Sequence, residues 1–192
     1  MKEIILIGAG GHCKSCIDII EMIEGYHVAG IVERKGSTIK EVLGYPVIGN
    51  DGDLANLRKK YDFAFVTVGQ IRSSDLKVHL FDQLKNLAFE QPSMVSPLAH
   101  VSNHATIGNG TIIMHHALVN AAVKIGENCI INSKALIEHD TVINDHCHIS
   151  TGAIINGGVT VGEKTFIGSN ATVKHGISIP SQSFVKAGSL LK

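Results

Sequence analysis

The fold of this chain is decided by residues 125–161, which read IGENCIINSKALIEHDTVINDHCHISTGAIINGGVTV. In this stretch a branched aliphatic residue returns at every sixth position. The same step extends back to Val95 and on to Val185, and all sixteen positions that it visits are Ile or Val. They are Val95, Val101, Ile107, Ile113, Val119, Ile125, Ile131, Ile137, Ile143, Ile149, Ile155, Val161, Ile167, Val173, Ile179 and Val185.

A second regularity accompanies the branched residues. From Val95 to Val173, the residue four places after each of them is Ala, Thr, Val or Cys, except at Ile177. The residue directly after them is often Gly, Asn or Ser, which tolerate turn geometry. Each six-residue unit therefore predicts one short flat strand and one turn, with the branched side chain pointing inward. Three such units form an 18-residue coil, so the pattern predicts a parallel β-helix of about five stacked coils.

The four cysteines fit this interpretation without disulfides. Cys129 and Cys147 are 18 residues apart in the same repeat slot, so we expect them one above the other, about 4.8 Å apart. We interpret both as small, reduced core residues. Cys13 and Cys16 form a Cys-x-x-Cys pair at a predicted helix start and are also expected to be reduced thiols.

The first half of the chain has a different pattern, in which apolar runs alternate with amphipathic segments. Residues 4–7, 28–32 and 63–68 are predicted strands, and residues 12–24 and 74–87 have roughly helical spacing of apolar side chains. This alternation predicts a small, Rossmann-like parallel α/β sheet. The period changes near residue 90, so we expect two domains, 1–90 and 91–192.

Composition narrows the possible partners. The chain has 17 basic and 17 acidic residues and is 44% hydrophobic, so it lacks the basic excess of a nucleic-acid binder. No stretch approaches the roughly 18 apolar residues of a membrane span, and the apolar start is too short for a signal peptide. We expect a cytoplasmic protein that binds neither nucleic acid nor membrane.

Three motifs carry a resemblance to a known family. They are Gly8-Ala9-Gly10-Gly11-His12 after the first strand, Val68-Gly69, and Ile137-Glu138-His139-Asp140 followed nine residues on by His148. With them the chain resembles the bacterial sugar O-acyltransferases of the sialic acid O-acetyltransferase type, which include the amino-sugar N-acetyltransferase of bacillosamine synthesis. The resemblance implies a left-handed β-helix and a homotrimer. It also implies acetyl-CoA bound between neighbouring β-helices and a free or nucleotide-linked sugar held by the N-terminal domain.

The resemblance also implies roles for residues of the β-helix. His139 would be the general base, and a neutral imidazole suits proton removal at cellular pH. Asp140 would orient it, as an acidic neighbour does in the family, at the position where the bacillosamine enzyme has Glu. The backbone N–H of Gly157 would bind the oxyanion. His148 and Gly168 would contact acetyl-CoA, and Asn132 would line the same cleft.

In the N-terminal domain the resemblance implies a sugar-nucleotide site. Gly8, Gly10, Gly11 and His12 would form the phosphate turn, because glycines let the backbone approach an anion at a helix N-terminus. Glu33 stands alone where the family has an acidic pair for the base, and Gly69 belongs to the same site. Cys13 stands where a third glycine would complete the Gly-x-Gly-x-x-Gly motif of dinucleotide-binding domains, so we do not predict NAD as a ligand. A plain strand-to-helix turn is the alternative interpretation.

The predicted function is therefore an acetyl-CoA-dependent acetyltransferase acting on an amino or hydroxyl group of a sugar in glycan synthesis. Two alternatives remain open at this point. One is a trimeric scaffold without catalysis, in which the α/β domain binds a ligand. The other is a zinc hydratase of the β-helix carbonic anhydrase type, suggested by His146 beside His148, although we expect no metal. The sequence leaves open the sugar, the nucleotide, and whether nitrogen or oxygen is acylated.

Overall fold

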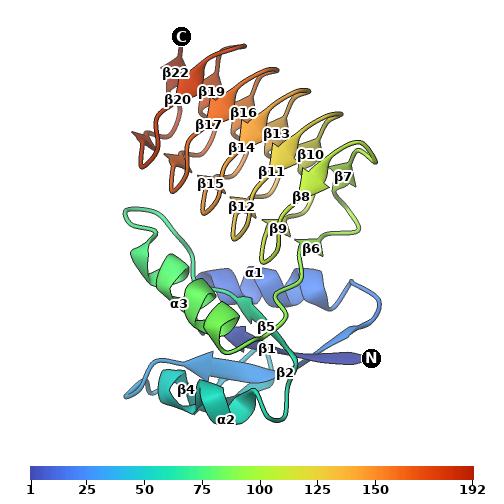
Figure 1. Cartoon of the computed structure of the whole chain (residues 1–192), viewed down its shortest axis with the longest axis vertical. Coiled ribbons are helices and arrows are strands. Elements are labelled where there is room, and N and C mark those ends of the chain that lie inside the picture. Colours follow the sequence, from blue (N-terminus) through green and yellow to red (C-terminus); the bar gives the residue numbers. More distant parts are fainter. The chain divides into compact units, whose positions relative to one another are not determined.

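A computed structural model describes every residue from Met1 to Lys192, and the chain divides into two compact units (Figure 1). The first unit consists of Met1–Gly69 and Asp75–Pro92. The second consists of Ser93–Lys192 together with a short segment of the first half, Gln70–Ser74. None of the helices combines the length and hydrophobicity that crossing a membrane requires.

The first unit is an α/β domain built on a five-stranded sheet with the order β3-β4-β2-β1-β5. All neighbours are parallel except the edge pair, β3 and β4. The predicted parallel α/β sheet is thus confirmed, with an antiparallel edge strand added. Its elements are β1 (Lys2–Ile7), α1 (Gly11–Ile20), β2 (Tyr26–Glu33), β3 (Glu41–Val42), β4 (Tyr45–Asn50), η1 (Asp51–Asp53), α2 (Leu54–Leu57), β5 (Phe63–Val66) and α3 (Asp75–Asn86).

The sequence signals explain the centre of this sheet better than its edge. Residues 4–7 of β1 are completely or almost completely buried, as expected for a central parallel strand covered on both faces. The edge hairpin of β3 and β4 was not predicted, because its strands are short and partly exposed. Leu43 and Gly44 form its turn with φ values of 51° and 84°, which is the geometry of a tight two-residue hairpin.

The second unit is a β-helix of seventeen two-residue parallel strands in three sheets, which we call the first, second and third faces. The first face contains β7 (His100–Val101), β10 (Leu118–Val119), β13 (Leu136–Ile137), β16 (Ile154–Ile155), β19 (Thr172–Val173) and β22 (Leu190–Leu191). The second face contains β8 (Thr106–Ile107), β11 (Lys124–Ile125), β14 (Val142–Ile143), β17 (Thr160–Val161) and β20 (Ser178–Ile179). The third face contains β6 (Met94–Val95), β9 (Ile112–Ile113), β12 (Ile130–Ile131), β15 (His148–Ile149), β18 (Phe166–Ile167) and β21 (Phe184–Val185).

The register confirms the 18-residue coil. Leu136 pairs with Leu118 below it and with Ile154 above it, and every other strand of the β-helix pairs by the same step. The repeating Ile and Val residues point inward and are buried from Ile113 to Val185, whereas those of the first coil are partly buried. Each full burial contributes about 1.5 to 3 kcal/mol, and these contributions accumulate along the axis.

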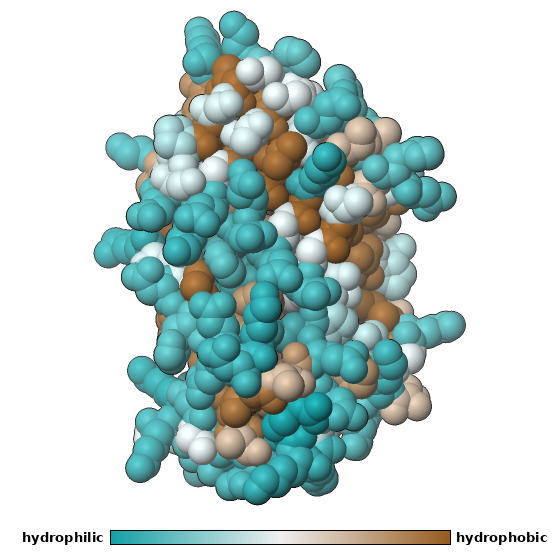
Figure 2. Space-filling view, in the orientation of Figure 1, coloured by the Kyte–Doolittle hydropathy of each residue, from teal (hydrophilic) through white to brown (hydrophobic).

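The outer surface of the first face is partly apolar. The outward side chains of Leu118, Leu136 and Ile154 remain half-buried, and Leu190 is 59% exposed. Figure 2 shows apolar side chains among polar ones on the surface of the β-helix. A row of partly exposed aliphatic side chains is unusual on a surface that stays in water, since such patches often mark interfaces.

The thiols provide a first testable consequence of this core. Cys129 and Cys147 are fully buried in successive coils, with the Cys147 backbone N–H donating to the Cys129 Sγ. The neighbouring Cys129 thiol and burial raise the pKa of Cys147, and burial raises the pKa values of Cys13 and Cys16. Because thiolates are the reactive species, we expect no cysteine to react with Ellman's reagent in the native protein at neutral pH. All four should react in guanidinium chloride. Rapid labelling of either β-helix cysteine under native conditions would contradict this packing.

Candidate active site

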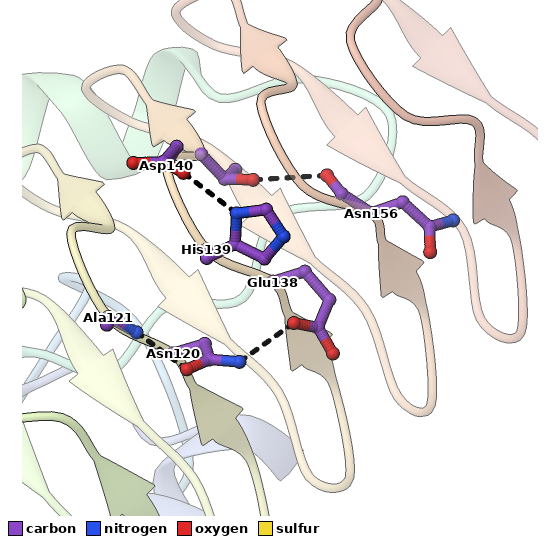
Figure 3. A network of polar contacts seen from close by, with 7 residues as sticks. Asn120, Ala121, Glu138, His139, Asp140 and Asn156 are labelled. Carbon is purple, nitrogen blue, oxygen red and sulfur yellow. Dashed lines mark hydrogen bonds and ion pairs between the residues drawn. The ribbon is translucent and has the colours of Figure 1, made fainter.

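His139 and Asp140 lie at the turn between β13 and β14, where the first and second faces meet. We call this edge of the β-helix the base corner. Asp140 adopts a φ of 59°, a left-handed conformation that Asp tolerates better than most residues. Its carboxylate Oδ2 lies 2.8 Å from His139 Nδ1 (Figure 3). Since a carboxylate accepts, Nδ1 carries the proton and Nε2 of the neutral ring keeps its lone pair. Both side chains are more than half exposed.

Gly157 lies one coil further on at the same corner, directly beside the His139 ring. A Cβ atom built on Gly157 would lie 2.8 Å from both Cε1 and Nε2 of His139. The imidazole therefore occupies the space that any larger residue would fill. The basic nitrogen and the Gly157 backbone are held together by the stacking of two successive coils.

The backbone N–H of Gly157 has no hydrogen-bond acceptor within the chain. At the equivalent position two coils earlier in the same column of turns, the Asn120 side chain accepts a 2.7 Å hydrogen bond from the Ala121 N–H (Figure 3). Asn156 precedes Gly157 in the same way, but its Nδ2 donates to the Val173 carbonyl at 2.6 Å. Unlike the Ala121 N–H, the Gly157 N–H makes no hydrogen bond to the side chain that precedes it.

Two further polar side chains lie at the base corner. Glu138 accepts a 2.8 Å hydrogen bond from Asn120 Nδ2 (Figure 3). The His175 ring lies on the other side of Gly157, with its centroid 6.4 Å from that of His139. The base corner therefore combines a histidine, its carboxylate partner and a backbone N–H without an acceptor in the protein. These are the groups that proton removal beside a developing oxyanion would need.

Asn132 and His148 lie elsewhere on the three-sided prism that the β-helix forms. Asn132 is at the turn between β12 and β13, where the third and first faces meet, and we call this edge the amide corner. Asn132 Nδ2 lies 3.3 Å from His148 Nε2, and His148 Nδ1 bonds to the backbone carbonyl of Gln70. The resemblance puts these residues in one cleft with His139, but in a single chain they occupy a different corner. Gln70 was not predicted, although it directly follows the Val68-Gly69 motif.

Gly168 is required by the packing of the coils themselves. A Cβ atom there would lie 2.4 Å from the backbone N of Ala187 in the next coil. Stacking alone thus explains why this position is glycine, and the predicted contact of Gly168 with acetyl-CoA stays a prediction.

The predicted phosphate turn follows β1 in the first unit. Gly8 has a φ of 107°, and a Cβ there would lie 2.7 Å from Val68 Cγ2, so backbone geometry demands glycine. In contrast, a Cβ on Gly10 or Gly11 would meet nothing within 4 Å. Helix α1 begins here without a side-chain cap, and uncapped N–H groups at a helix N-terminus are the donors that an anion site uses.

The remaining predicted residues of this domain lie at the same edge of the sheet. Glu33 ends β2, and its Oε2 accepts a 2.7 Å hydrogen bond from the Ala9 N–H of the glycine turn. Gly69 follows β5 and packs against His12, with 3.5 Å between an added Cβ and the His12 Cβ. The carboxyl ends of β1, β2 and β5 thus bring these residues together, where ligands of open α/β sheets bind.

The histidines that suggested zinc have other neighbours. His146 Nδ1 lies 3.0 Å from Asn128 Nδ2, and the chain contains no group of three or more His, Cys, Asp or Glu side chains arranged to hold a metal ion.

Comparison with protein families gave two matches. Residues 3–75 match the PglD N-terminal domain. Residues 104–139, 122–157 and 140–175 each match the bacterial transferase hexapeptide model of six repeats. The comparison with curated protein sequences gave no match.

Solved structures resemble the whole chain. A mutant of perosamine N-acetyltransferase from Caulobacter crescentus, in complex with CoA and GDP-perosamine, is 31% identical with a TM-score of 0.93, and the match covers 100% of this chain and 89% of that one. The acetyltransferase domain of PglB from Neisseria gonorrhoeae is 29% identical, with a TM-score of 0.90 and coverage of 100% and 92%. The same domain in complex with acetyl coenzyme A is 28% identical, with a TM-score of 0.89 and coverage of 99% and 92%.

Proposed function

Because this chain belongs to the family of hexapeptide-repeat sugar acyltransferases, we propose that it transfers an acetyl group from acetyl-CoA to the amino group of a nucleotide-linked sugar. The observation that carries the proposal is the placement of the His139 ring against Gly157. The similarity to a perosamine N-acetyltransferase favours nitrogen over a hydroxyl oxygen as the acceptor atom. A nucleotide-linked product would be ready for transfer into a glycan.

His139 is the general base in this proposal. Its Nε2 accepts the proton that the sugar amine loses as it attacks the acetyl carbonyl, and the imidazolium then returns a proton to the departing sulfur. Asp140 stabilises the imidazolium through the 2.8 Å contact to Nδ1 and keeps the ring in the tautomer whose Nε2 is basic. The shorter arm of Asp, compared with the Glu of the family, therefore still reaches the ring.

The Gly157 N–H supplies the electrostatic part of catalysis. It donates to the carbonyl oxygen as negative charge develops there, which is commonly one of the largest contributions in acyl transfer. The Gly157 N–H can donate without prior rearrangement, because it has no hydrogen bond within the protein that must first be broken. Acetyl-CoA delivers the activated acetyl group, and His148 and Gly168 are proposed to border it.

The first unit is proposed to hold the nucleotide. Gly10 and Gly11 leave the start of α1 open to a diphosphate. Glu33 lies at the neighbouring strand end, where its carboxylate already braces the turn through the Ala9 N–H. His12 and Gly69 are the remaining residues of this proposed nucleotide site at the carboxyl edge of the sheet.

The proposal is tested by a thiol-release assay with acetyl-CoA and a panel of GDP-, UDP- and dTDP-linked amino sugars, with the matching hydroxy sugars as controls. Turnover with at least one amino sugar, and product mass higher by one acetyl group, would support it. The absence of turnover across both panels, with protein that binds acetyl-CoA, would contradict the assigned reaction.

We further propose that the protein acts as a homotrimer with sites shared between neighbours. The base corner carries His139 and Gly157, whereas Asn132 lies at the amide corner of the same prism. A single chain cannot bring these edges together, but a second copy can place its amide corner against the base corner of the first. The partly apolar first face, which joins the two corners, is the surface that such packing would cover.

Shared sites predict complementation between two inactive variants. Co-expression of differently tagged His139→Ala and Asn132→Ala chains should give mixed trimers in which some interfaces combine two intact corners. For random assembly into closed rings, about a quarter of the sites would be restored. Activity of purified mixed trimers is compared with that of each homotrimer. If the mixed trimers do no better than the average of the two parents, each chain contains a complete site.

A further inference from the structure

Four groups of the second unit form a continuous hydrogen-bond chain. The Ser133 N–H donates to Asn132 Oδ1 at 2.7 Å. Asn132 Nδ2 lies 3.3 Å from His148 Nε2, and His148 Nδ1 lies 2.5 Å from the Gln70 carbonyl oxygen. The chain thus runs from the amide corner, across the third face, to the segment Gln70–Ser74.

The two ends of this chain fix its direction. The backbone N–H of Ser133 can only donate, so the oxygen of the Asn132 amide faces it and the nitrogen faces His148. The backbone carbonyl of Gln70 can only accept, so His148 must carry its proton on Nδ1. Nε2 then has a lone pair that accepts from Asn132. An imidazolium would place two donors against each other at Nε2 and break the chain.

The histidine in the middle has little freedom to move. Its residue is 6% exposed, and its ring packs edge-on against Phe166 with 5.2 Å between the ring centroids. Gln70, whose backbone carbonyl accepts the hydrogen bond from His148 Nδ1–H, is 2% exposed, and its side-chain amide donates to the His146 carbonyl at 2.9 Å. The Gln70 carbonyl, which ends the hydrogen-bond chain, is therefore held in place independently of His148.

The asparagine at the other end has one hydrogen left over. Nδ2 carries two hydrogens, and only one of them is directed at His148. The other hydrogen has no acceptor within the protein. It belongs to an amide whose orientation is fixed by the Ser133 N–H on one side and by His148 on the other. It is consequently a preoriented donor at the surface of the amide corner.

We infer that His148 is a positioning residue: held as the neutral Nδ1–H tautomer by Gln70, it orients the Asn132 amide so that the free N–H of Asn132 binds a carbonyl oxygen of acetyl-CoA. The inference rests on the proposed function. His148 acts on the acetyl-CoA carbonyl through Asn132. The carbonyl is either that of the thioester or an amide carbonyl of the pantetheine arm, which share the same acceptor chemistry.

The tautomer can be measured without any enzymatic assay. Long-range ¹H–¹⁵N correlation spectra of the full-length protein, labelled with ¹⁵N at histidine, distinguish the two neutral tautomers and the imidazolium. The His148 signals are assigned by their absence in His148→Phe. We expect the Nδ1–H form at neutral pH. An Nε2–H form or an imidazolium would overturn the inference, whether or not the proposed reaction is correct.

The functional part is tested by substitutions of different hydrogen-bonding capacity. His148→Phe keeps an aromatic ring beside Phe166 but removes both bonds, and we expect a loss of roughly three- to tenfold. His148→Gln has a donor and an acceptor that can rebuild the chain in the same direction, and activity should stay within about threefold of the wild type. His104→Gln, an exposed histidine of the first coil, is the matched control and should change nothing.

A double-mutant cycle separates action through Asn132 from independent action. Asn132→Ala/His148→Phe should be no less active than Asn132→Ala alone, because the orienting bond has nothing left to orient. A fall in kcat in His148→Phe assigns the free N–H to the thioester carbonyl, and a rise in the KM for acetyl-CoA assigns it to the pantetheine arm. Losses that multiply in the double variant, or wild-type kinetics in a correctly folded His148→Phe, would overturn the inference.

Discussion

Replacing His139 with alanine is expected to lower kcat by about 10² to 10⁴-fold, the usual contribution of a positioned general base. The KM values should change little, because the ring accepts the proton during attack and is not a main binding contact. The His139 side chain is 55% exposed, so its removal leaves no core cavity and the melting temperature should stay close to that of the wild type. Steady-state kinetics with acetyl-CoA and the best amino sugar of the panel measure the effect.

The control for this variant is His104→Ala, which removes an exposed histidine from the same edge of the β-helix, in the turn two coils before that of His139. It should retain wild-type kinetics. If His139→Ala kept activity within about threefold of the wild type, the base would have to be sought elsewhere, and the proposed mechanism at this corner would be wrong.

Replacing Gly157 with alanine should be almost as damaging, with an expected loss of about 10²-fold. The added methyl group would lie 2.8 Å from Cε1 and Nε2 of His139, so the ring must swing away from the Gly157 N–H. The backbone at this position is outside the left-handed region, so alanine adds no strain of its own. A misplacement of about 1 Å is sufficient for such a loss.

The matched test places Gly157→Ala in the His139→Ala background. If the methyl group acts by displacing the imidazole, it should cost almost nothing once the imidazole is gone, and the two effects should not multiply. Fully multiplicative losses would instead mean that Gly157→Ala damages the oxyanion donor or the coil itself. Circular dichroism and the oligomeric state of all three variants are compared with the wild type.

The β-helix could be predicted from the sequence because its stabilising interactions repeat. Every coil buries the same kind of side chain at the same position, so the six-residue period records the contacts between neighbouring coils directly. The edge hairpin of β3 and β4 left no such record. β3 is only two residues long, and both strands are only partly buried, so no apolar periodicity distinguishes them from loop.

The candidate site was predictable only in part. The His139-Asp140 pair is adjacent in sequence, so its hydrogen bond could be anticipated from the motif. The role of Gly157 beside the imidazole depends on the 18-residue coil, which the period already specifies. Gln70, however, is 78 residues away from His148 in sequence, and nothing in its neighbourhood indicates that its carbonyl accepts a hydrogen bond from the histidine.

The sequence alone thus determined the stacked prism, the central α/β sheet and the residue types available for acyl transfer, because each is encoded by a local period or a short motif. The tertiary structure decided how these residues are divided between corners of the prism. It placed His139 and Gly157 on one edge, Asn132 and His148 on another, and the Gln70–Ser74 segment against the third face. Such placement depends on where each turn falls around the coil and on contacts between distant segments, which no local pattern specifies.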